Sequence, residues 1–518
     1  MESTEHPAQP DLRNGLPPIR KWLLLTGGMG LFLVVLKVAG QLQLSQETLV
    51  FIPLSLAAGA AFLLWPGLTL AAWIFLSGVI TWPLLGEEIY LYDLMTALLL
   101  LLLVIRFAAR GTLNVSGLDG WVLAIYGVAI FSVLVNLHRL DEVSDLFIRL
   151  RQKALEFPGK LQISALLLWL THIVAYFAVS QLADTRKKIL WCFLAVLGMG
   201  VANCIYALYG WSQNPAGFSR WNRTLGFLFM VQDQGHLSAL VLLGMLSTVL
   251  SRWGRGFAWR WWLFGLTGSV FLMNLVFNFT RAVYVEFVLG ILILLFLSKS
   301  GRLFIVIFLI GALIAGVLMS VKIERQATKY ITAFTSPQGR GLTLRMAIWK
   351  DAVRLIREDG KLMGVGLGNY LVYNQARFYP EPGVTRKSAS AHSLYLQVLA
   401  EQGVPGLLVW LGFLIATLRF FYRRLRRATD PISRSLYLWL FTILIIHSLD
   451  SLVYMSIMPP PGAHTAPSVG YYLWILLGLG VAYSRLEDKD QSDGAPLKSS
   501  HTIDPGQPFT ASQTEGQP

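Results

Sequence analysis

The chain has 518 residues, of which 55% are hydrophobic and only 14% are charged, and its formal net charge is +14. Apolar runs long enough to cross a bilayer recur along the whole chain, which excludes a separate soluble domain of ordinary composition. The basic residues stand mostly in short clusters beside these runs, where they orient helices against the cytoplasm, so the positive charge does not indicate a nucleic-acid partner.

The fold predicted from these runs is an all-α polytopic membrane protein with about 12–14 transmembrane helices. Arg20 and Lys21 precede the first run and predict a cytoplasmic N-terminus. The predicted parts are a disordered cytoplasmic N-terminus (1–20), a helical bundle (21–320), an extracytoplasmic loop (321–403), C-terminal membrane helices (404–485) and a disordered cytoplasmic tail (486–518). The candidate spans lie near 22–40, 48–64, 67–85, 93–109, 119–137, 161–183, 188–211, 227–250, 261–278, 281–298, 303–320, 404–421, 436–456 and 469–485.

The segment 138–160 departs from this charge pattern. It falls on the predicted outer side, yet it carries five basic residues among four acidic ones. Its mixture of charges and leucines predicts an amphipathic helix that lies on the outer interface.

Three further arginines on the predicted outer side are candidates for binding phosphate. Arg220 and Arg223 lie in GFSRWNRTLG, and Arg281 lies in FNFTRAVYVEFVLG. A guanidinium group can donate two parallel hydrogen bonds to phosphate oxygens. Arginines on the outer face oppose the positive-inside tendency, which favours a function for them, although anionic lipid headgroups would explain one or two.

Several ionisable residues fall inside predicted spans, all in the outer halves of their helices. Buried charge is costly at membrane depth, so we expect these side chains to face a cavity or one another. The alternative is a purely structural hydrogen bond between helices. The residues are Asp233 with His236, Glu286, and His447 with Asp450.

A metal or other cofactor is not predicted. The chain has no His-x-x-x-His or Cys-x-x-Cys pair, and no acidic cluster resembles a cation cage. Cys192 and Cys204 lie in one apolar run and are expected to be small buried residues.

The segment 340–369 predicts an amphipathic helix that carries Arg345, followed by a glycine-rich turn. The glycines do not follow a strand, so they do not make a dinucleotide fingerprint. A flexible turn with close backbone approach is the favoured interpretation. These glycines are Gly364, Gly366 and Gly368, with Asn369 after them.

The sharpest signal is AHSLYLQVLAEQGVPG, in which His392 and Ser393 are followed by nine residues and then by Gly403-Val404-Pro405-Gly406. If 393–402 is helical, His392 lies in its first turn, Ser390 is a candidate N-cap, and the glycine–proline break ends the helix. The positive helix end disfavours a protonated imidazole and favours a nearby phosphate. A neutral histidine beside an anion suits a general base. The alternative is a histidine that only satisfies a hydrogen bond at a membrane interface.

The His392-Ser393 pair, followed by nine residues and Gly403-x-x-Gly406, resembles the signature of the O-antigen ligase and polymerase superfamily of bacterial envelope proteins. The segment FTRAVYVEF is similar to the family's arginine-starting helix. The residues that resemble the segment ahead of the family histidine are Arg345, Trp349, Gly364, Gly366, Gly368 and Asn369.

This resemblance implies a GT-C-like glycosyltransferase in the bacterial inner membrane, with its active face in the periplasm. It implies transfer of a glycan from a polyprenyl-pyrophosphate carrier, such as undecaprenyl pyrophosphate, to a hydroxyl of lipid A core, protein or another glycan. No metal and no nucleotide sugar take part in that reaction. On this basis Arg220, Arg223, Arg281 and Arg345 are expected to bind the pyrophosphate, and His392 to activate or position the acceptor hydroxyl.

Two alternatives remain open from the sequence. A polymerase of the same superfamily, for O-antigen or exopolysaccharide, would use another carrier-linked glycan as acceptor. A transporter of a small anion or a lipid-linked sugar would explain the basic residues and buried pairs without catalysis. Transport predicts polar residues through both halves of the membrane, whereas here they gather on one side.

Overall fold

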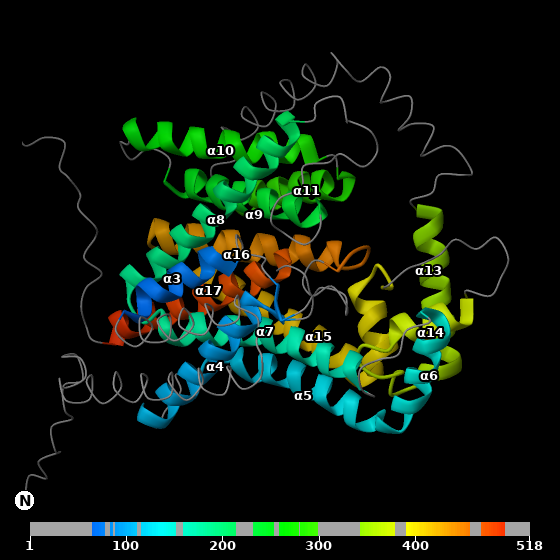
Figure 1. The fold of residues 1–518 in the computed structure, drawn as a ribbon. Helices are drawn as coiled ribbons and strands as arrows, with labels where there is room; N and C mark the ends of the chain where they lie inside the picture. Colours follow the sequence, from blue (N-terminus) through cyan, green and yellow to red (C-terminus); the bar gives the residue numbers. More distant parts are fainter. Residues whose placement is uncertain are drawn as a thin grey trace, which may run out of the picture.

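The computed structural model describes residues 65–77, 83–85, 89–110, 115–151, 159–213, 231–252, 258–278, 280–298, 342–378, 390–455 and 468–492. These residues are almost entirely helical (Figure 1). The strands among them form one short antiparallel ribbon of β1 (Pro83–Leu85) and β2 (Ile89–Tyr90). The predicted spans near 22–40, 48–64 and 303–320 lie outside the described residues.

Six helices of the described chain are long and apolar enough to cross a membrane, or up to seven if a bent pair counts as one span. The prediction of an all-α polytopic membrane protein is therefore confirmed, while the number of 12–14 spans stays a prediction. The six are α7 (Lys160–Leu182), α8 (Arg186–Gln213), α9 (Val231–Arg252), α15 (Leu394–Arg427), α16 (Pro431–Asp450) and α17 (Val469–Ser492). Other helices beside them are α3 (Pro66–Ser77), α4 (Leu91–Arg110), α5 (Asp119–Val135), α10 (Ala258–Asn278) and α11 (Arg281–Leu297).

The helices pack side by side with their apolar faces inward. Figure 1 shows α9, α10 and α11 on one side of the bundle and α5, α7 and α15 on the other, with α16 and α17 between them. Trp410, Phe413 and Trp474 stack at the contact of α15 with α17, with ring centroids 5.4 and 5.2 Å apart. At Gly478 a Cβ would lie 2.6 Å from the carbonyl oxygen of Tyr176, so glycine allows α17 to approach α7 closely.

A second, smaller apolar cluster lies at the end of the bundle where α5 turns into α6 (Leu140–Arg151), through the 3-10 turn η1 (Leu137–Arg139) and a bend of 52°. It joins α6 to α13 (Leu342–Leu355), the π-helical turn η3 (Ile356–Gly360) and α14 (Tyr370–Phe378), on the right in Figure 1. The helix predicted in 138–160 is therefore present as α6. Tyr373 of α14 donates a hydrogen bond to Glu142 of α6 at 2.9 Å.

The C-terminal end of α17 differs from the predicted boundary. The predicted tail begins at 486, whereas the helix continues to Ser492. Arg424 and Arg186 form ion pairs with Asp488 and Asp490 of this last turn, at 2.5 and 2.7 Å. These ion pairs with neighbouring helices stabilise the polar last part of α17, which lies beyond the span that hydropathy predicts.

Candidate functional site

His392 lies immediately before α15 in a backbone conformation that few residues adopt. Its φ is +48°, in the left-handed region, which costs about 1–2 kcal/mol for a residue with a Cβ. Such a conformation persists only where the surroundings hold it, and it is common at functional sites. The imidazole is half-buried.

The start of the helix differs from the prediction. Ser393, in extended backbone, is the N-cap of α15, and its side chain accepts a hydrogen bond from the N–H of Leu396 at 3.5 Å. Ser390 instead accepts from the N–H of His392 at 3.4 Å. The assignment of Ser390 as the N-cap and of His392 to the first helical turn is therefore wrong. His392 stands just outside the helix, because Ser393 satisfies the free N–H group there.

The predicted glycine–proline break is present, because the non-helical backbone of Gly403 divides α15 into two helical segments that meet at a kink. Gly403 has a φ of +69°, and a Cβ at this position would lie 2.1 Å from the carbonyl oxygen of Leu362. Pro405 follows in the first turn of the second segment. The N–H of Val404 donates to that same Leu362 carbonyl at 2.9 Å. The kink therefore lets the backbone of another segment dock directly against the helix. Gly406, in the second helical segment, is also buried.

The docked segment is the glycine-rich turn. Gly364, Gly366 and Gly368 have φ values of +77°, +101° and +80°, and a Cβ on Gly364 would lie 2.5 Å from the carbonyl oxygen of Glu401. The N–H of Gly366 donates to that carbonyl at 2.9 Å. The predicted turn with close backbone approach is confirmed. It fixes α13 and α14 against the first segment of α15.

Arg345 of α13 is brought near His392 by this docking. Burial, and then the positive charge of Arg345, lower the pKa of His392 from its ordinary value. The lowered pKa favours the neutral imidazole, which is the form that can accept a proton. The prediction that His392 acts as a base beside a bound anion stays a prediction.

Two buried polar residues that the sequence reading missed support the loop that carries His392. The side-chain oxygen of Gln397 accepts from the N–H of Ala391 at 2.8 Å, and its amide donates to Glu401 at 2.7 Å. Glu401 also accepts from the N–H of Tyr370 at 3.3 Å. The available signal was the spacing of four residues, which places Gln397 and Glu401 on one face of the helix.

Replacing Gln397 with methionine is expected to lower the population of the correct His392 conformation. The N–H of Ala391 would lose its acceptor, and a buried unpaired group costs about 1–3 kcal/mol, which corresponds to roughly 5- to 150-fold. For the glycan transfer that the sequence resemblance implies, we expect the turnover number to fall within that range, with little change in KM for the donor. The matched control is Tyr395→Phe, because Tyr395 lies on the same helical turn as Gln397. This substitution removes a hydrogen bond from Tyr395 to the carbonyl of Ser448 on α16. Equal losses in both variants would contradict a positioning role for Gln397.

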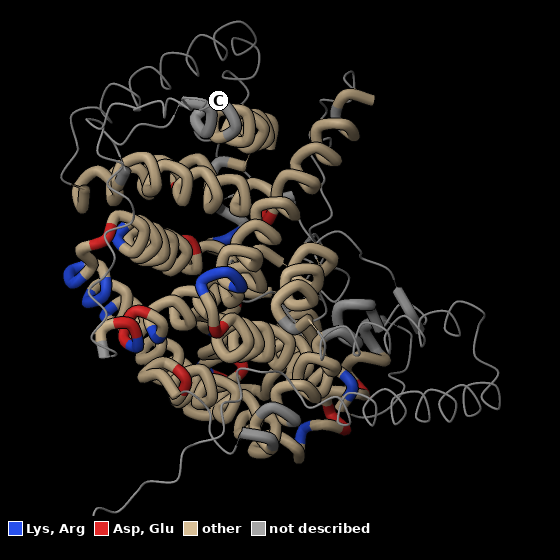
Figure 2. Tube along the Cα trace, turned by 90° about the vertical axis from the view of Figure 1, so that its left-hand side faces the viewer, with Lys and Arg blue, Asp and Glu red and all other residues tan. Residues whose placement is uncertain are grey.

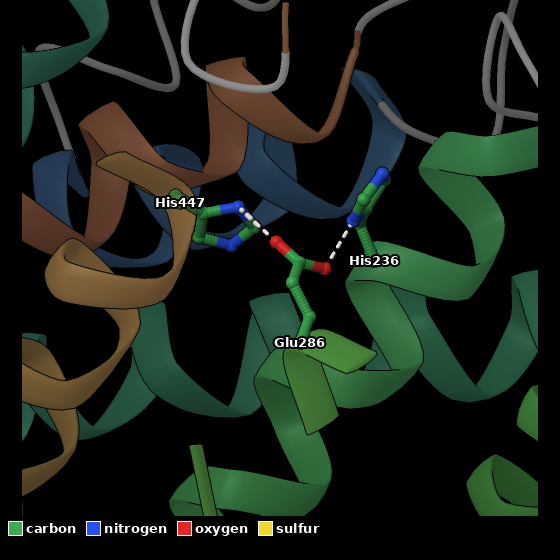
Figure 3. A group of neighbouring side chains, drawn as sticks. All are labelled: His236, Glu286 and His447. Carbon is green, nitrogen blue, oxygen red and sulfur yellow. Dashed lines mark hydrogen bonds and ion pairs between the residues drawn. The ribbon is translucent and has the colours of Figure 1, made fainter. Parts of the chain in front are cut away.

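The ionisable residues predicted inside spans do meet one another. Figure 3 shows the carboxylate of Glu286, on α11, between the imidazoles of His236, on α9, and His447, on α16. One oxygen contacts Nδ1 of His236, and the other lies 3.2 Å from Nδ1 of His447. Nε2 of His236 lies 3.8 Å from Asp450. These contacts join three helices, as expected for charges that pair at membrane depth.

This buried cluster adjoins the His392 site. The ring of Tyr454 stacks on that of His236, with centroids 5.4 Å apart. Burial and then the carboxylates of Asp233 and Asp450 raise the pKa of Tyr454 well above its ordinary value, and the charge of Arg345 opposes this rise. In addition, the N–H of Leu394 donates to the carbonyl of Ser451, the residue after Asp450, at 2.9 Å. The end of α16 that carries part of the cluster therefore contacts the start of α15 directly.

The three ligand atoms of His236, Glu286 and His447 lie within 4.8 Å of one another, a spacing that could hold a metal ion. In the geometry present, however, the two imidazoles face opposite oxygens of one carboxylate rather than a common centre (Figure 3). That arrangement pairs the groups directly. The expectation of metal-independent chemistry stays a prediction.

The other predicted phosphate-binding residues are only partly located. Arg281 is the first residue of α11, so its backbone lies about 7.5 Å along the helix axis from that of Glu286. Arg220 and Arg223 lie outside the described residues. The buried free cysteines Cys192 and Cys204 lie on α8, away from these contacts in sequence and packed in the apolar core.

Taken together, the fold and the site define a multi-pass helical membrane protein with a histidine and an arginine beside a buried charged cluster at one end of its bundle. A family model described as O-antigen ligase (Wzy_C) matches residues 266–411. The match runs from α10 into α15 and includes Arg281, Glu286, Arg345, the glycine turn and His392. It confirms the resemblance to the O-antigen ligase superfamily. No curated protein matches the chain.

Proposed function

We propose that the protein is an O-antigen ligase-like glycosyltransferase that moves a glycan from a polyprenyl-pyrophosphate carrier to an acceptor hydroxyl at the periplasmic face of the inner membrane. The observation that carries this proposal is the half-buried His392 in a strained backbone conformation, where burial and then the charge of Arg345 lower its pKa. The family match over the same segment supports it.

In the proposed reaction the acceptor oxygen attacks the anomeric carbon of the donor glycan. The bond from that carbon to the pyrophosphate oxygen breaks, the hydroxyl proton passes to His392, and polyprenyl pyrophosphate leaves. Arg345, with Arg281, Arg220 and Arg223, stabilises the negative charge that grows on the leaving group. A single displacement of this kind inverts the anomeric centre.

The direct test is transfer by the purified full-length protein in detergent or nanodiscs, supplied with a polyprenyl-pyrophosphate glycan. We expect glycan on lipid A core or another hydroxyl acceptor, free polyprenyl pyrophosphate, and no effect of EDTA. Longer carrier-linked glycan would instead indicate a polymerase. Movement of intact donor across a vesicle membrane, with no new glycosidic bond, would contradict the proposal.

The pH dependence of transfer follows from the environment of His392. A general base works in its neutral form, and the lowered pKa extends that form to lower pH. We expect kcat/KM to rise with pH along a limb centred below about 6.5, the ordinary histidine value, and to stay flat to about pH 8. The profile is measured with initial rates at subsaturating donor. A limb centred above the ordinary value would contradict the assignment.

A further inference from the structure

A groove at the opposite end of α15 from His392 carries a concentration of arginine. Its cavity of about 320 Å³ lies between the start of α5, at Gly117 and Leu118, and the last turns of α15. Ala416 and Phe420 form the apolar part of the α15 wall. Figure 2 looks at the bundle from the left-hand side of Figure 1, the end that holds the last turn of α15.

The arginines of this groove carry more positive charge than their neighbours offset. Arg424 lies over the ring of Phe420 and is paired with Asp488. Arg419, Arg423 and Arg427 also line the cavity, are exposed, and form no ion pair with any residue in the described parts of the chain. Their spacing of four residues places them on one face of the helix.

The carboxylates near this end have other partners. Asp119, next to Leu118, binds Arg485 at 2.8 Å and accepts from Tyr176 at 2.7 Å. Asp430 caps α16 through the N–H groups of Ile432 and Ser433. The charge of Arg427 also acts on Asp488, the partner of Arg424. Arg419 and Arg423 offer the less compensated guanidinium groups of the row, which suit a phosphate.

An apolar track leads from this row along the same face of α15. Ile415, Leu411 and Leu408 precede Arg419 at intervals of four, four and three residues, and they are 65%, 38% and 62% exposed. From Leu408 to Arg419 the helix rises about 16 Å, roughly half of the ~30 Å hydrocarbon core of a bilayer. A charged row at the end of a track of this length matches one phospholipid, with its phosphate at the arginines and an acyl chain along the leucines.

We propose that this groove is a binding site for an anionic glycerophospholipid. The continuity of the apolar track with the arginine row favours a lipid over a soluble phosphate, which would use only the charged part. The site is separate from the His392 centre and does not depend on the proposed transfer reaction. The bound lipid would anchor the start of α5 and the end of α15 to the adjacent membrane leaflet.

The test compares lipid retention by two double variants of the full-length protein. Arg419→Gln with Arg423→Gln removes two groove arginines, whereas Arg426→Gln with Arg434→Gln removes two arginines that do not line the cavity. Bound phosphatidylglycerol, phosphatidylcholine and glycerol phosphate are measured by native mass spectrometry after equal loading. Elution as a single species shows that each variant is folded.

We expect phosphatidylglycerol to be retained in preference to phosphatidylcholine, and the groove variant to retain it at least tenfold more weakly than the control variant. Arg419→Lys with Arg423→Lys should recover part of the loss, because the charge returns without the fork of donors. Equal losses in both glutamine variants, equal retention of phosphatidylcholine, or equally tight binding of glycerol phosphate would each overturn the proposal.

Discussion

Replacing His392 with alanine is expected to reduce glycan transfer by about 10²–10⁴-fold, the range that general base assistance contributes. The imidazole lies outside the helix and is half-buried, so its removal leaves the N-cap at Ser393 and the docked glycine turn in place. We therefore expect normal expression and nearly unchanged binding of the polyprenyl-pyrophosphate donor. The measurement is the single-turnover rate with purified protein and saturating donor.

The matched control is His138→Ala. His138 is an exposed histidine in η1, and its Nδ1 contacts only the carbonyl of Val135 at 3.1 Å among the described residues. We expect transfer within twofold of the parent protein. A normal rate in the His392 variant would show that the base is another group. If the His392 variant lost donor binding as well as the transfer rate, His392 would be assigned to donor binding instead.

Arg345→Gln is expected to reduce transfer by about 10²–10³-fold, because one electrostatic donor to a developing charge contributes about that much. The KM for the donor should rise as well, since the guanidinium also contacts the ground-state pyrophosphate in the proposed reaction. A second effect separates this role from a structural one. Loss of the cation removes a repulsion, so the pKa of His392 should rise, and the ascending limb of the pH profile should move to higher pH.

Lys350→Gln on the same helix provides the comparison for this variant, because Lys350 is exposed. It removes an equal charge and should leave both the rate and the pH profile unchanged. A variant at Arg345 that lost activity without any shift in the profile would contradict the electrostatic contact with His392.

Hydropathy and glycine placement predicted much of the fold. Desolvation of the backbone forces apolar segments into helices, so α7, α8, α9 and α16 fall close to their predicted ranges. The kink at Gly403 and the close approach at Gly364 were also predictable, because few residues other than glycine adopt those φ values.

Cross-helix contacts were harder to predict, because sequence spacing reports only neighbours on one helix. The pairs Asp233 with His236 and His447 with Asp450 were placed together by their spacing. In the fold Glu286, from a third helix, links the two histidines. The N-cap was misplaced because Ser390 and Ser393 are both good capping residues, and only the tertiary contact with Ser451 selects Ser393.

Gln397 illustrates a different difficulty. A polar side chain on an apolar helix can face lipid headgroups, a cavity or a neighbouring loop, and its partner here, the N–H of Ala391, exists only once the loop has formed. Such support for a functional loop depends on the tertiary fold rather than on a local pattern.

The most direct test of the proposed site is a cryo-electron microscopy structure of the full-length protein with a non-transferable polyprenyl-pyrophosphate glycan. The proposal predicts pyrophosphate oxygens within hydrogen-bonding distance of the Arg345 guanidinium, with the His392 imidazole facing the anomeric carbon from the side opposite the pyrophosphate. A pyrophosphate bound elsewhere, or an imidazole turned away from that carbon, would contradict it.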